Sequence, residues 1–403
     1  MSRTIVVGAG QAAGQLVASL RQEKYEGEIL MIGEEPHLPY QRPPLSKAYL
    51  AGELPTERIL VRPEKFYADK AIEARLATKV TAIDRDARTV TVETGETLAW
   101  DHLVLATGSH VRRLRIPGID LPGVHYLRTM ADVDGIREGI GEDRRLVIVG
   151  GGYIGLEVAA VARKLGMQVT VLEMEERILA RVTTPEMSAY YTKVHSAHGV
   201  EIRTGAAAAE ILGEDRVTGV KCTDGTEIGA DMVIVGVGIL PTTELAEAAG
   251  LACDNGIVVD EHCRTSDPAV FAIGDCTNHP SPLLGRRLRL ESVPNAMDQA
   301  RTVAKNIMGK ETVYDAVPWF WSDQYDLKLQ MVGFSADADE SVLRGDPDSG
   351  SFARFYLKDG VIVAVDAVNR PKEFMASKQL VAARRAVDAA ALADETVDVK
   401  ELV

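Results

Sequence analysis

An internal repeat constrains the fold of this 403-residue chain more than any other feature of its sequence. The segment VTVETGETLAWDHLVLATG at 90–108 aligns with VKCTDGTEIGADMVIVGVG at 220–238 at a constant offset of 130. In this alignment Gly95 matches Gly225, Asp101 matches Asp231 and Gly108 matches Gly238. Each copy follows an apolar strand pattern, a Gly-rich turn and a helix pattern. Because such alternation favours parallel sheets, we expect an α/β chain with two Rossmann-like dinucleotide-binding domains.

The first Gly-rich turn, in VVGAGQAAGQLVASL, places Gly8, Gly10 and Ala13 in the GxGxxG/A pattern between a strand and a helix. The first glycine makes the tight turn and the second lets a pyrophosphate approach the backbone, while alanine keeps the helix close to the strand. The helix N-terminus adds about half a positive charge. Glu34, at the end of the next strand pattern, is the expected ribose acceptor, although the neighbouring Glu35 competes for that role.

The second Gly-rich turn, in VIVGGGYIGLEVAA, supplies five candidate contacts, which are Gly150, Gly152, Tyr153, Ile154 and Gly155. The next strand pattern ends at Glu173, 23 residues after Gly150. A carboxylate there can accept both ribose hydroxyls of NADH. It would repel the 2′-phosphate of NADPH by on the order of 4 kcal/mol, roughly a thousandfold preference. We therefore expect NADH, although Arg177 could permit some use of NADPH and Glu173 could be a purely structural residue.

Three further turns complete the pattern. The first ends the strand pattern DHLVLATG and contains Ala106, Thr107 and Gly108. A GxG turn ends at Gly238, and the turn in FAIGDC contains Asp275. An aspartate in that place can bind a polyhydroxyl chain close to a pyrophosphate. A single GD pair is an ordinary turn, so its weight comes from its occurrence together with the other motifs.

Composition excludes several classes of partner. The net charge of −14 argues against nucleic acid or an anionic membrane as the main partner. No apolar run approaches the roughly 20 residues that span a bilayer, and we expect no targeting peptide before the strand pattern TIVVGAG. The cysteines are scattered without a CxxC pair, at Cys222, Cys253, Cys263 and Cys276. We therefore expect no metal centre, iron–sulfur cluster or disulfide framework, and a cytoplasmic location.

The remaining segments set the expected outline of the chain. The Pro-rich stretch PHLPYQRPPLSK precedes a helix expected near 45–51. Beyond residue 314 the aromatic cluster PWFWSDQY leads into alternating runs typical of antiparallel strands, with a helix expected near 373–386. This last part of the chain is expected to form a third, α+β domain.

In the order GxGxxA…E, ATG, GGGxxGxE…E, GxG and AIGD, the motifs resemble those of the two-dinucleotide-binding flavoprotein superfamily, over nearly the whole chain. The resemblance implies the glutathione-reductase-like fold. It implies a discontinuous FAD-binding domain at 1–110 and 236–313, an NADH-binding domain at 111–235 and a C-terminal interface domain at 314–403.

The subfamily follows from what stands after the first ribose glutamate. Glutathione-reductase-like members carry a redox CxxxxC there, and a His–Glu pair near the C-terminus. This chain has RPPLSK at 42–47, and its last 100 residues contain no histidine. Together with GEEPHLPYQRPPLSKAYLAG and ESVPNAMDQAR, this resembles the NADH-dependent ferredoxin reductases of bacterial P450 and aromatic-ring dioxygenase systems. A rubredoxin reductase, an NADH oxidase and a redox-responsive interaction protein similar to apoptosis-inducing factor remain alternatives.

The resemblance implies transfer of electrons from NADH through FAD, one at a time, to a [2Fe–2S] ferredoxin. It implies that Lys47 and Glu157 form an ion pair beside the flavin and that Trp321 covers the flavin toward the acceptor. The alternatives are that Glu157 only caps or packs its own helix and that Trp321 belongs to a core. Arg42 is expected to reach an FAD phosphate, because guanidinium suits that anion.

The segment ESVPNA and the helix after it supply the other implied contacts. Ser292 and Val293 lie where the family contacts the isoalloxazine ring, and Glu291 where it faces the nicotinamide. Ferredoxins of this kind are acidic, so we expect docking on a local basic surface despite the net charge. Arg301 and Lys305 are the candidates, with Arg286, Arg287 and Arg289 nearby in sequence. A monomer or a weak dimer is expected.

Overall fold

The computed structural model describes residues 2–402, and the chain divides into two compact units. The first unit comprises Met1–Arg42, Pro55–His110 and Ile239–Pro318. The second comprises Pro43–Leu54, Val111–Gly238 and Trp319–Val403. Each unit contains a five-stranded parallel sheet, so the predicted α/β fold class is confirmed. The predicted division into three domains stays a prediction.

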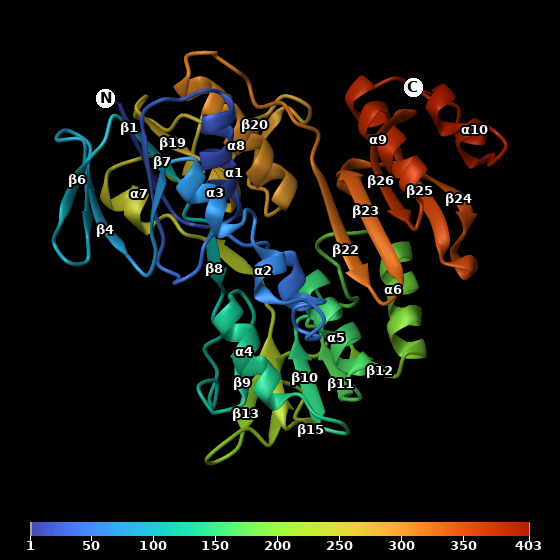
Figure 1. The fold of residues 1–403 in the computed structure, drawn as a ribbon. Helices are drawn as coiled ribbons and strands as arrows, with labels where there is room; N and C mark the ends of the chain where they lie inside the picture. Colours follow the sequence, from blue (N-terminus) through green and yellow to red (C-terminus); the bar gives the residue numbers. More distant parts are fainter. Residues whose placement is uncertain (1, 403) are drawn as a thin grey trace. The chain divides into compact units, whose positions relative to one another are not determined.

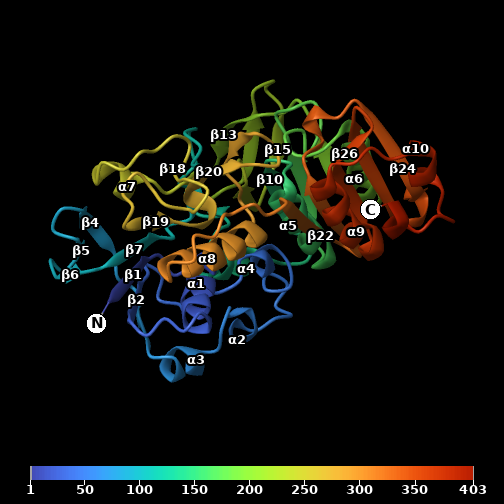
Figure 2. The same ribbon diagram turned by 90° about the horizontal axis from the view of Figure 1, so that it is seen from above.

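The parallel sheet of the first unit has the strand order β19-β7-β1-β2-β3. Its strands are β1 Arg3–Val7, β2 Glu28–Ile32, β3 Ile72–Arg75, β7 His102–Leu105 and β19 Val270–Ala272. Val6 on β1 belongs to one apolar cluster, while Ile5 and Val7 belong to another. Both faces of the sheet are therefore covered, which explains why the strand patterns are almost continuously apolar. The helices α1 (Gln11–Gln22) and α8 (Val293–Ile307) lie side by side (Figure 1; Figure 2).

Shorter elements complete the first unit. The helices are α2 Thr56–Ile59, α3 Glu64–Asp69 and α7 Glu244–Ala248, with a 3-10 turn, η2, at Gly274–Cys276. The strands β4 Val80–Asp84, β5 Thr89–Val92 and β6 Thr97–Ala99 form an antiparallel meander. The remaining strands are β17 Ile239–Pro241, β18 Ile257–Val258, β20 Thr277–Ser281 and β21 Arg286–Leu288. Strand β8, Ser109–Val111, includes the boundary after His110 between the first and second units.

The parallel sheet of the second unit has the order β12-β11-β10-β16-β9. Its strands are β9 Val124–Tyr126, β10 Arg145–Val149, β11 Gln168–Leu172, β12 Val200–Arg203 and β16 Met232–Val235. The helices beside it are α4 Met130–Gly139, α5 Tyr153–Lys164 and α6 Pro185–Ala197. A second antiparallel meander consists of β13 Ala208–Leu212, β14 Gly219–Cys222 and β15 Glu227–Gly229.

The C-terminal part of the second unit is an antiparallel sheet in the order β22-β23-β26-β25-β24. Its strands are β22 Trp319–Gln324, β23 Leu327–Gly333, β24 Glu340–Asp346, β25 Ser351–Lys358 and β26 Val361–Val368. The helices α9 (Pro371–Ala383) and α10 (Ala389–Ala393) follow, with 3-10 turns η3 Ser335–Asp337, η4 Pro347–Ser349 and η5 Val399–Leu402. The α9 helix packs on β23 and β26 (Figure 1). The predicted antiparallel strands after residue 314 are confirmed.

The predicted internal repeat is confirmed in the backbone. The bounds of β5, β6 and β7, each shifted by 130, are those of β14, β15 and β16. The two turn glycines adopt the same left-handed conformation, with φ of 87° at Gly95 and 88° at Gly225. Asp101 accepts a hydrogen bond from the Arg3 backbone at 2.7 Å, and Asp231 accepts one from Arg145 at 2.9 Å.

The prediction of a helix near 45–51 is wrong. Only a 3-10 turn, η1, forms at Pro43–Ser46, and irregular turns follow it. The Pro44 carbonyl accepts both the Lys47 N–H at 3.0 Å and the Tyr49 N–H at 2.9 Å. An α-helix requires each carbonyl to accept from the residue four positions later, so this sharing stops its propagation.

Candidate functional site

The first Gly-rich turn has the geometry of a phosphate cradle. Gly8 has φ of 115°, and a Cβ there would lie 2.1 Å from the Ala106 carbonyl oxygen. Gly10 is the N-cap of α1, and a Cβ there would meet nothing within 4 Å. Ala13 is fully buried. The N-terminus of α1 therefore presents open backbone of the kind that a pyrophosphate needs, and these residues fit a dinucleotide.

The polar residues near this cradle include partners that the sequence reasoning missed. Arg42 donates to Glu35 at 2.7 Å, and Glu35 also accepts the Tyr40 hydroxyl at 2.5 Å. Burial lowers the pKa of Arg42, but the charges of Tyr40, Glu35 and Asp275 outweigh it and leave that pKa raised. Glu34 is exposed and lies 3.4 Å from Lys79. Glu35 is thus the acceptor that fixes Arg42, while contact of Arg42 with a phosphate stays a prediction.

Asp275 and the ATG turn are held by local hydrogen bonds. The Ser109 hydroxyl donates to Asp275 at 2.9 Å, and the Thr107 hydroxyl donates to the Thr242 carbonyl at 2.7 Å. The charge of Asp275 acts on Arg42, so two predicted FAD residues from distant parts of the sequence are brought together. Gly108 has φ of 67°, a conformation that favours glycine.

The α8 segment places its predicted residues at a helix N-terminus. Ser292 is the N-cap and accepts from the Asn295 N–H at 3.2 Å, and Val293 begins the helix. Glu291 is ion-paired with Arg289. Among the predicted docking residues, Arg301 is paired with Asp298 at 2.6 Å, and Arg287 donates to Asn278 and to the Val259 carbonyl.

The second Gly-rich turn repeats the geometry of the first. Gly150 has φ of 114°, and a Cβ there would lie 2.4 Å from the Gly236 carbonyl oxygen. Gly152 is the N-cap of α5 and has nothing within 4 Å of a Cβ position. A Cβ on Gly155 would lie 2.3 Å from the Gly150 carbonyl oxygen, so glycine is required there for close packing. This turn also fits a dinucleotide.

The flanking residues of this second turn differ in exposure. Ile154 is 44% exposed, whereas the Tyr153 hydroxyl contacts the Met331 sulfur at 2.9 Å. Gly238 has φ of 102° and open space at its Cβ position. These two open positions, Ile154 and Gly238, suit contact with a ligand, while Tyr153 is committed to the C-terminal sheet.

Glu173 is held toward the second turn by backbone donors. Its Oε2 accepts from the Gly151 N–H at 2.8 Å and its Oε1 from the Glu175 N–H at 3.0 Å. Arg177 donates to Ser188 at 2.6 Å and to the carbonyls of Thr183 and Ala180, each at 2.9 Å. These bonds commit Arg177 to its own loop rather than to a 2′-phosphate, which removes the main sequence argument for use of NADPH.

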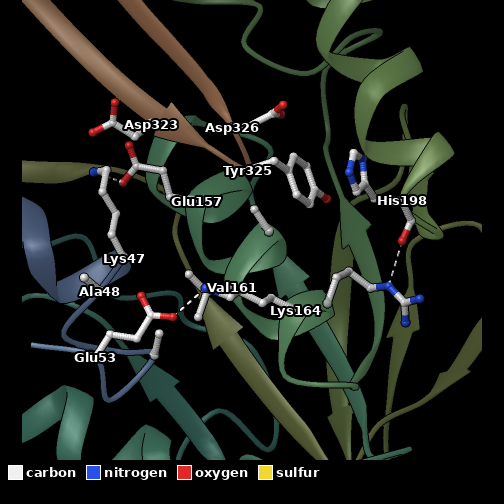
Figure 3. A pocket seen from close by; sticks show the side chains of 13 residues that line it. Lys47, Ala48, Glu53, Glu157, Val161, Lys164, His198, Asp323, Tyr325 and Asp326 are labelled. Carbon is white, nitrogen blue, oxygen red and sulfur yellow. Dashed lines mark hydrogen bonds and ion pairs between the residues drawn. The ribbon is translucent and has the colours of Figure 1, made fainter.

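Lys47 and Glu157 form the predicted ion pair (Figure 3). Lys47 Nζ lies 2.7 Å from Glu157 Oε2, and the Ser46 hydroxyl donates to the same oxygen at 2.5 Å. The Ser322 hydroxyl donates to Glu157 Oε1 at 2.6 Å. Glu157 is 3% exposed and its carboxylate bonds residues outside α5, so it does not merely cap its own helix.

A cavity of about 540 Å³ adjoins this pair. Figure 3 shows Lys47 and Glu157 on one side of it and Tyr325 on the other. Its remaining lining residues are Ala48, Ala51, Glu53, Ala160, Val161, Arg163, Lys164, His198, Asp323 and Asp326. The cavity belongs entirely to the second unit.

The sequence reasoning missed Ser46 and Ser322. Ser46 is adjacent to Lys47, and Ser322 is adjacent to Trp321 on β22. Successive strand residues point to opposite faces, so Ser322 points toward Glu157 while Trp321 points away. The Trp321 ring lies 5.6 Å from that of Trp319. Alternation along the strand places Ser322 and Gln324 on one face, but these polar residues carry no sequence signal that the face is buried.

The cysteines have no part in this site. All four are free, and none lies in the 42–47 segment. Burial raises the pKa of the Cys253 thiol to about 11 and that of the Cys276 thiol above its usual value. Within residues 2–402 no group of three or more His, Cys, Asp or Glu side chains is arranged to hold a metal ion. The same residues contain no helix that is both long and apolar enough to cross a membrane.

Two dinucleotide cradles, with a buried Lys–Glu pair in place of a cysteine pair, define a two-dinucleotide-binding oxidoreductase. The pyridine nucleotide-disulphide oxidoreductase family matches residues 2–300, and the reductase C-terminal family matches 319–403. The chain is 48% identical to the ferredoxin reductase subunit of 5,5′-dehydrodivanillate O-demethylase from Sphingobium sp., over 99% of this chain and 97% of that protein. It is 45% identical to putidaredoxin reductase from Pseudomonas putida, over 99% and 96%.

A solved structure agrees with these relatives. The covalent putidaredoxin reductase–putidaredoxin complex matches with a TM-score of 0.97 and 45% identity, over 100% of this chain and 98% of that one. The chain therefore belongs to the FAD-dependent NADH:ferredoxin reductases, a branch of the pyridine nucleotide-disulphide oxidoreductase family. Its cofactors are FAD and NAD(H), and it is an oxidoreductase.

Proposed function

We propose that this chain transfers electrons from NADH through FAD to a [2Fe–2S] ferredoxin, which feeds a cytochrome P450 or a ring-hydroxylating dioxygenase. The observation that carries the proposal is the Lys47–Glu157 pair, built by a segment that contains no cysteine. A disulphide reductase needs a thiolate beside its flavin. Without one, electrons have to leave the flavin directly for an external acceptor. The ferredoxin reductase components among the relatives support this assignment.

The domain roles follow from the two cradles. We assign FAD to Gly8, Gly10, Ala13 and the ATG turn, with Arg42 and Asp275 on its phosphates and polyhydroxyl chain. NADH is assigned to the second turn, with Glu173 on the adenosine ribose. Within this scheme 1–110 and 236–313 form the FAD domain, 111–235 the NADH domain and 314–403 the interface domain. Bound FAD supplies the chemistry that turns a two-electron donor into a one-electron source.

The residues of this chain position the reactants rather than transfer protons. Glu157 is held by three donors and Lys47 by the Glu157 carboxylate, so the ammonium group has one fixed place. A fixed cation beside a reaction that develops negative charge stabilises that charge without reorganisation. Glu173 is fixed before NADH binds, because two backbone N–H groups already hold it. Such preorganisation reduces the entropy lost on binding.

Docking of the ferredoxin is assigned to a local basic surface that includes Arg301 and Lys305. The pairing of Arg301 with Asp298 weakens its part, which leaves Lys305 as the stronger candidate. We further propose a monomer or weak dimer that acts in the cytoplasm, in keeping with four free cysteines. Electrostatic docking predicts a rate that falls as ionic strength rises from low salt to about 0.15 M, where the Debye length is about 8 Å.

The test is NADH-driven reduction of cytochrome c, with and without candidate [2Fe–2S] ferredoxins and rubredoxins. The proposal expects a ferredoxin to accelerate turnover well above the oxygen background, and expects salt to suppress that acceleration. Acceleration by rubredoxin alone would instead favour a rubredoxin reductase. Turnover that no acceptor increases, with a long-lived complex of reduced protein and NAD⁺, would overturn the proposal in favour of a redox-responsive interaction protein.

A further inference from the structure

Glu157 terminates a chain of hydrogen bonds that begins at the cavity wall. Ser322 donates to Glu157 Oε1 at 2.6 Å, and the Gln324 side-chain amide donates to the Ser322 oxygen at 3.1 Å. His195 Nε2 lies 2.8 Å from the Gln324 amide oxygen, and the Tyr325 hydroxyl lies 3.1 Å from His195 Nδ1. All these residues belong to the second unit, although they come from α5, α6, β22 and the turn after it.

The donor and the acceptor of each hydrogen bond in this series follow from the chemistry of the side chains. A carboxylate and an amide oxygen only accept, so Ser322 donates to Glu157 and His195 Nε2 carries a proton for Gln324. Because a neutral imidazole has one donor and one acceptor, His195 Nδ1 accepts from Tyr325. Burial lowers the pKa of His195 to about 4 and raises the pKa of Tyr325 to about 12. Both side chains therefore keep these roles at neutral pH.

The hydrogen-bonded residues between Tyr325 and Glu157 are buried, so each of their polar groups needs its partner. Ser322 and His195 have no exposed surface, and Gln324 is 1% exposed. A buried polar group without a partner is costly, so reversing one bond would leave at least one group unsatisfied. The charge of Glu157 and the donors behind it thus select one arrangement of the whole chain.

Tyr325 is held in an uncommon backbone conformation at the far end of the chain. It lies in the two-residue turn between β22 and β23, with φ of 57°, in the left-handed region that bulky residues rarely adopt. Its ring stacks on His198, with centroids 3.7 Å apart and an interplanar angle of 14°. Such strain persists where the surroundings over-determine it, and it is frequently associated with function.

We infer that Ser322, Gln324 and His195 are positioning residues that orient Glu157, and through it Lys47, by donating in one direction toward the Glu157 carboxylate. Ser322 occupies Oε1, which leaves Oε2 to Ser46 and Lys47. The place of the Lys47 ammonium is therefore set in part by α6 and β22. This inference rests on the proposed function, in which the Lys47 ammonium stabilises negative charge that develops during electron transfer.

The first arm of the test measures anaerobic reduction of the bound FAD by NADH in rapid-mixing experiments. Ser322→Ala removes the hydroxyl that donates to Glu157. Gln324→Glu removes the amide group that donates to Ser322 and keeps a side chain of nearly the same volume. Each is expected to slow reduction about tenfold, the effect of one lost buried hydrogen bond, with the Kd of NADH unchanged. Ser377→Ala is the matched control, because Ser377 is a fully buried serine of α9 whose hydroxyl binds the Glu373 carbonyl.

The Glu157→Gln background separates positioning from simple loss of stability. If the chain acts through Glu157, Ser322→Ala has no further effect on reduction once Glu157→Gln is present. Equal slowing by Ser322→Ala in both backgrounds would overturn the inference. A wild-type reduction rate in Glu157→Gln alone would instead overturn the proposed role of the pair, so the two failures can be told apart.

The second arm needs no turnover and no substitution of Ser322, Gln324 or His195. Nitrogen NMR of the histidine rings in the full-length protein is expected to show His195 as the neutral tautomer protonated at Nε2, from pH 6 to pH 8. Glu157→Gln is expected to shift its Nε2–H signal, because the chain connects the two residues. A proton on Nδ1, or a His195 signal indifferent to Glu157→Gln, would overturn the inference even if the Ser322 variant failed to fold.

Discussion

The two dinucleotide modules of this chain share the backbone of their Gly-rich turns and differ in how they hold the carboxylate to which we assign ribose binding. Gly8 and Gly150 have φ of 115° and 114°, and in both a Cβ would strike a carbonyl oxygen of the neighbouring strand end. Glu173 is held by two backbone N–H groups, whereas Glu34 lies exposed beside Lys79. The backbone of the turn to which we assign phosphate binding is thus duplicated, whereas the two carboxylates to which we assign ribose binding are held differently.

The largest expected effect concerns the carboxylate of the second module. Glu173→Gln keeps an oxygen for the Gly151 N–H but removes the charge that repels a 2′-phosphate. The ratio of kcat/KM for NADH over NADPH is expected to fall by on the order of a thousandfold, about 4 kcal/mol. Steady-state kinetics with both nucleotides measure it. Glu34→Gln in the first module is the control and should leave the ratio unchanged; an equal fall in both variants would erase the distinction between the modules.

Substitution of alanine for Gly8 or for Gly150 should lower the free energy of unfolding by similar amounts. Gly8→Ala and Gly150→Ala each combine a left-handed backbone with a Cβ less than 2.5 Å from a carbonyl oxygen. We expect each to lower the free energy of unfolding by about 3 to 4 kcal/mol, measured by urea denaturation. Gly10→Ala and Gly152→Ala meet nothing within 4 Å and should weaken dinucleotide binding without comparable loss of stability. Stability that survives Gly8→Ala but not Gly150→Ala would show that the two turns are not equivalent.

The second module also has a buried tie to the C-terminal sheet. The hydroxyls of Thr183 and Tyr356 donate to Asp366 at 3.0 and 2.9 Å, and burial raises the pKa of Asp366 to about 6. Since this pKa exceeds the unfolded value of 3.8, the folded protein binds more protons between about pH 4 and 6. The stability contributed by Asp366 is therefore present below pH 4 and is lost as pH rises through 6.

Asp366→Asn should remove this loss of stability at pH values above 6. The variant is expected to be more stable than the wild type at pH 7.5 by at most about 3 kcal/mol, with the difference shrinking toward pH 4. Urea denaturation across pH 4 to 8 measures it, and Glu340→Gln, which removes an exposed carboxylate from the same sheet, is the control. A variant less stable than the wild type at pH 7.5 would contradict the raised pKa.

Elements that are determined by a local sequence pattern could be predicted from the sequence. Contacts between residues that are distant in the sequence could not. Glycine spacing and apolar runs predict both cradles, both meanders and the repeat, because those elements are fixed by backbone sterics and by burial. The bond between Ser322 and Glu157 joins residues 165 positions apart, and no local pattern records it. The prediction of the Lys47–Glu157 pair depends on resemblance more than on spacing. The helix expected near 45–51 failed because the Pro44 carbonyl is shared between two N–H donors.

The smallest effect distinguishes the aspartates that directly precede β7 and β16 in the two modules. Asp231 accepts from the Arg145 backbone and from two nitrogens of its guanidinium, at 3.2 and 2.8 Å, whereas Asp101 accepts from the Arg3 backbone at 2.7 Å. The hydrogen bonds from Arg145 lower the pKa of Asp231 to about 2.

Because that pKa is depressed, the stabilisation by Asp231 is present above about pH 4 and is lost as pH falls toward 2. The pair is solvent-screened, so Asp231→Asn should cost less than about 1 kcal/mol at pH 7. Asp101→Asn should cost less still, since it loses no guanidinium partner. Thermal denaturation of both variants at pH 7 measures the difference, and a larger cost for Asp101→Asn would place the stronger anchor in the first module instead.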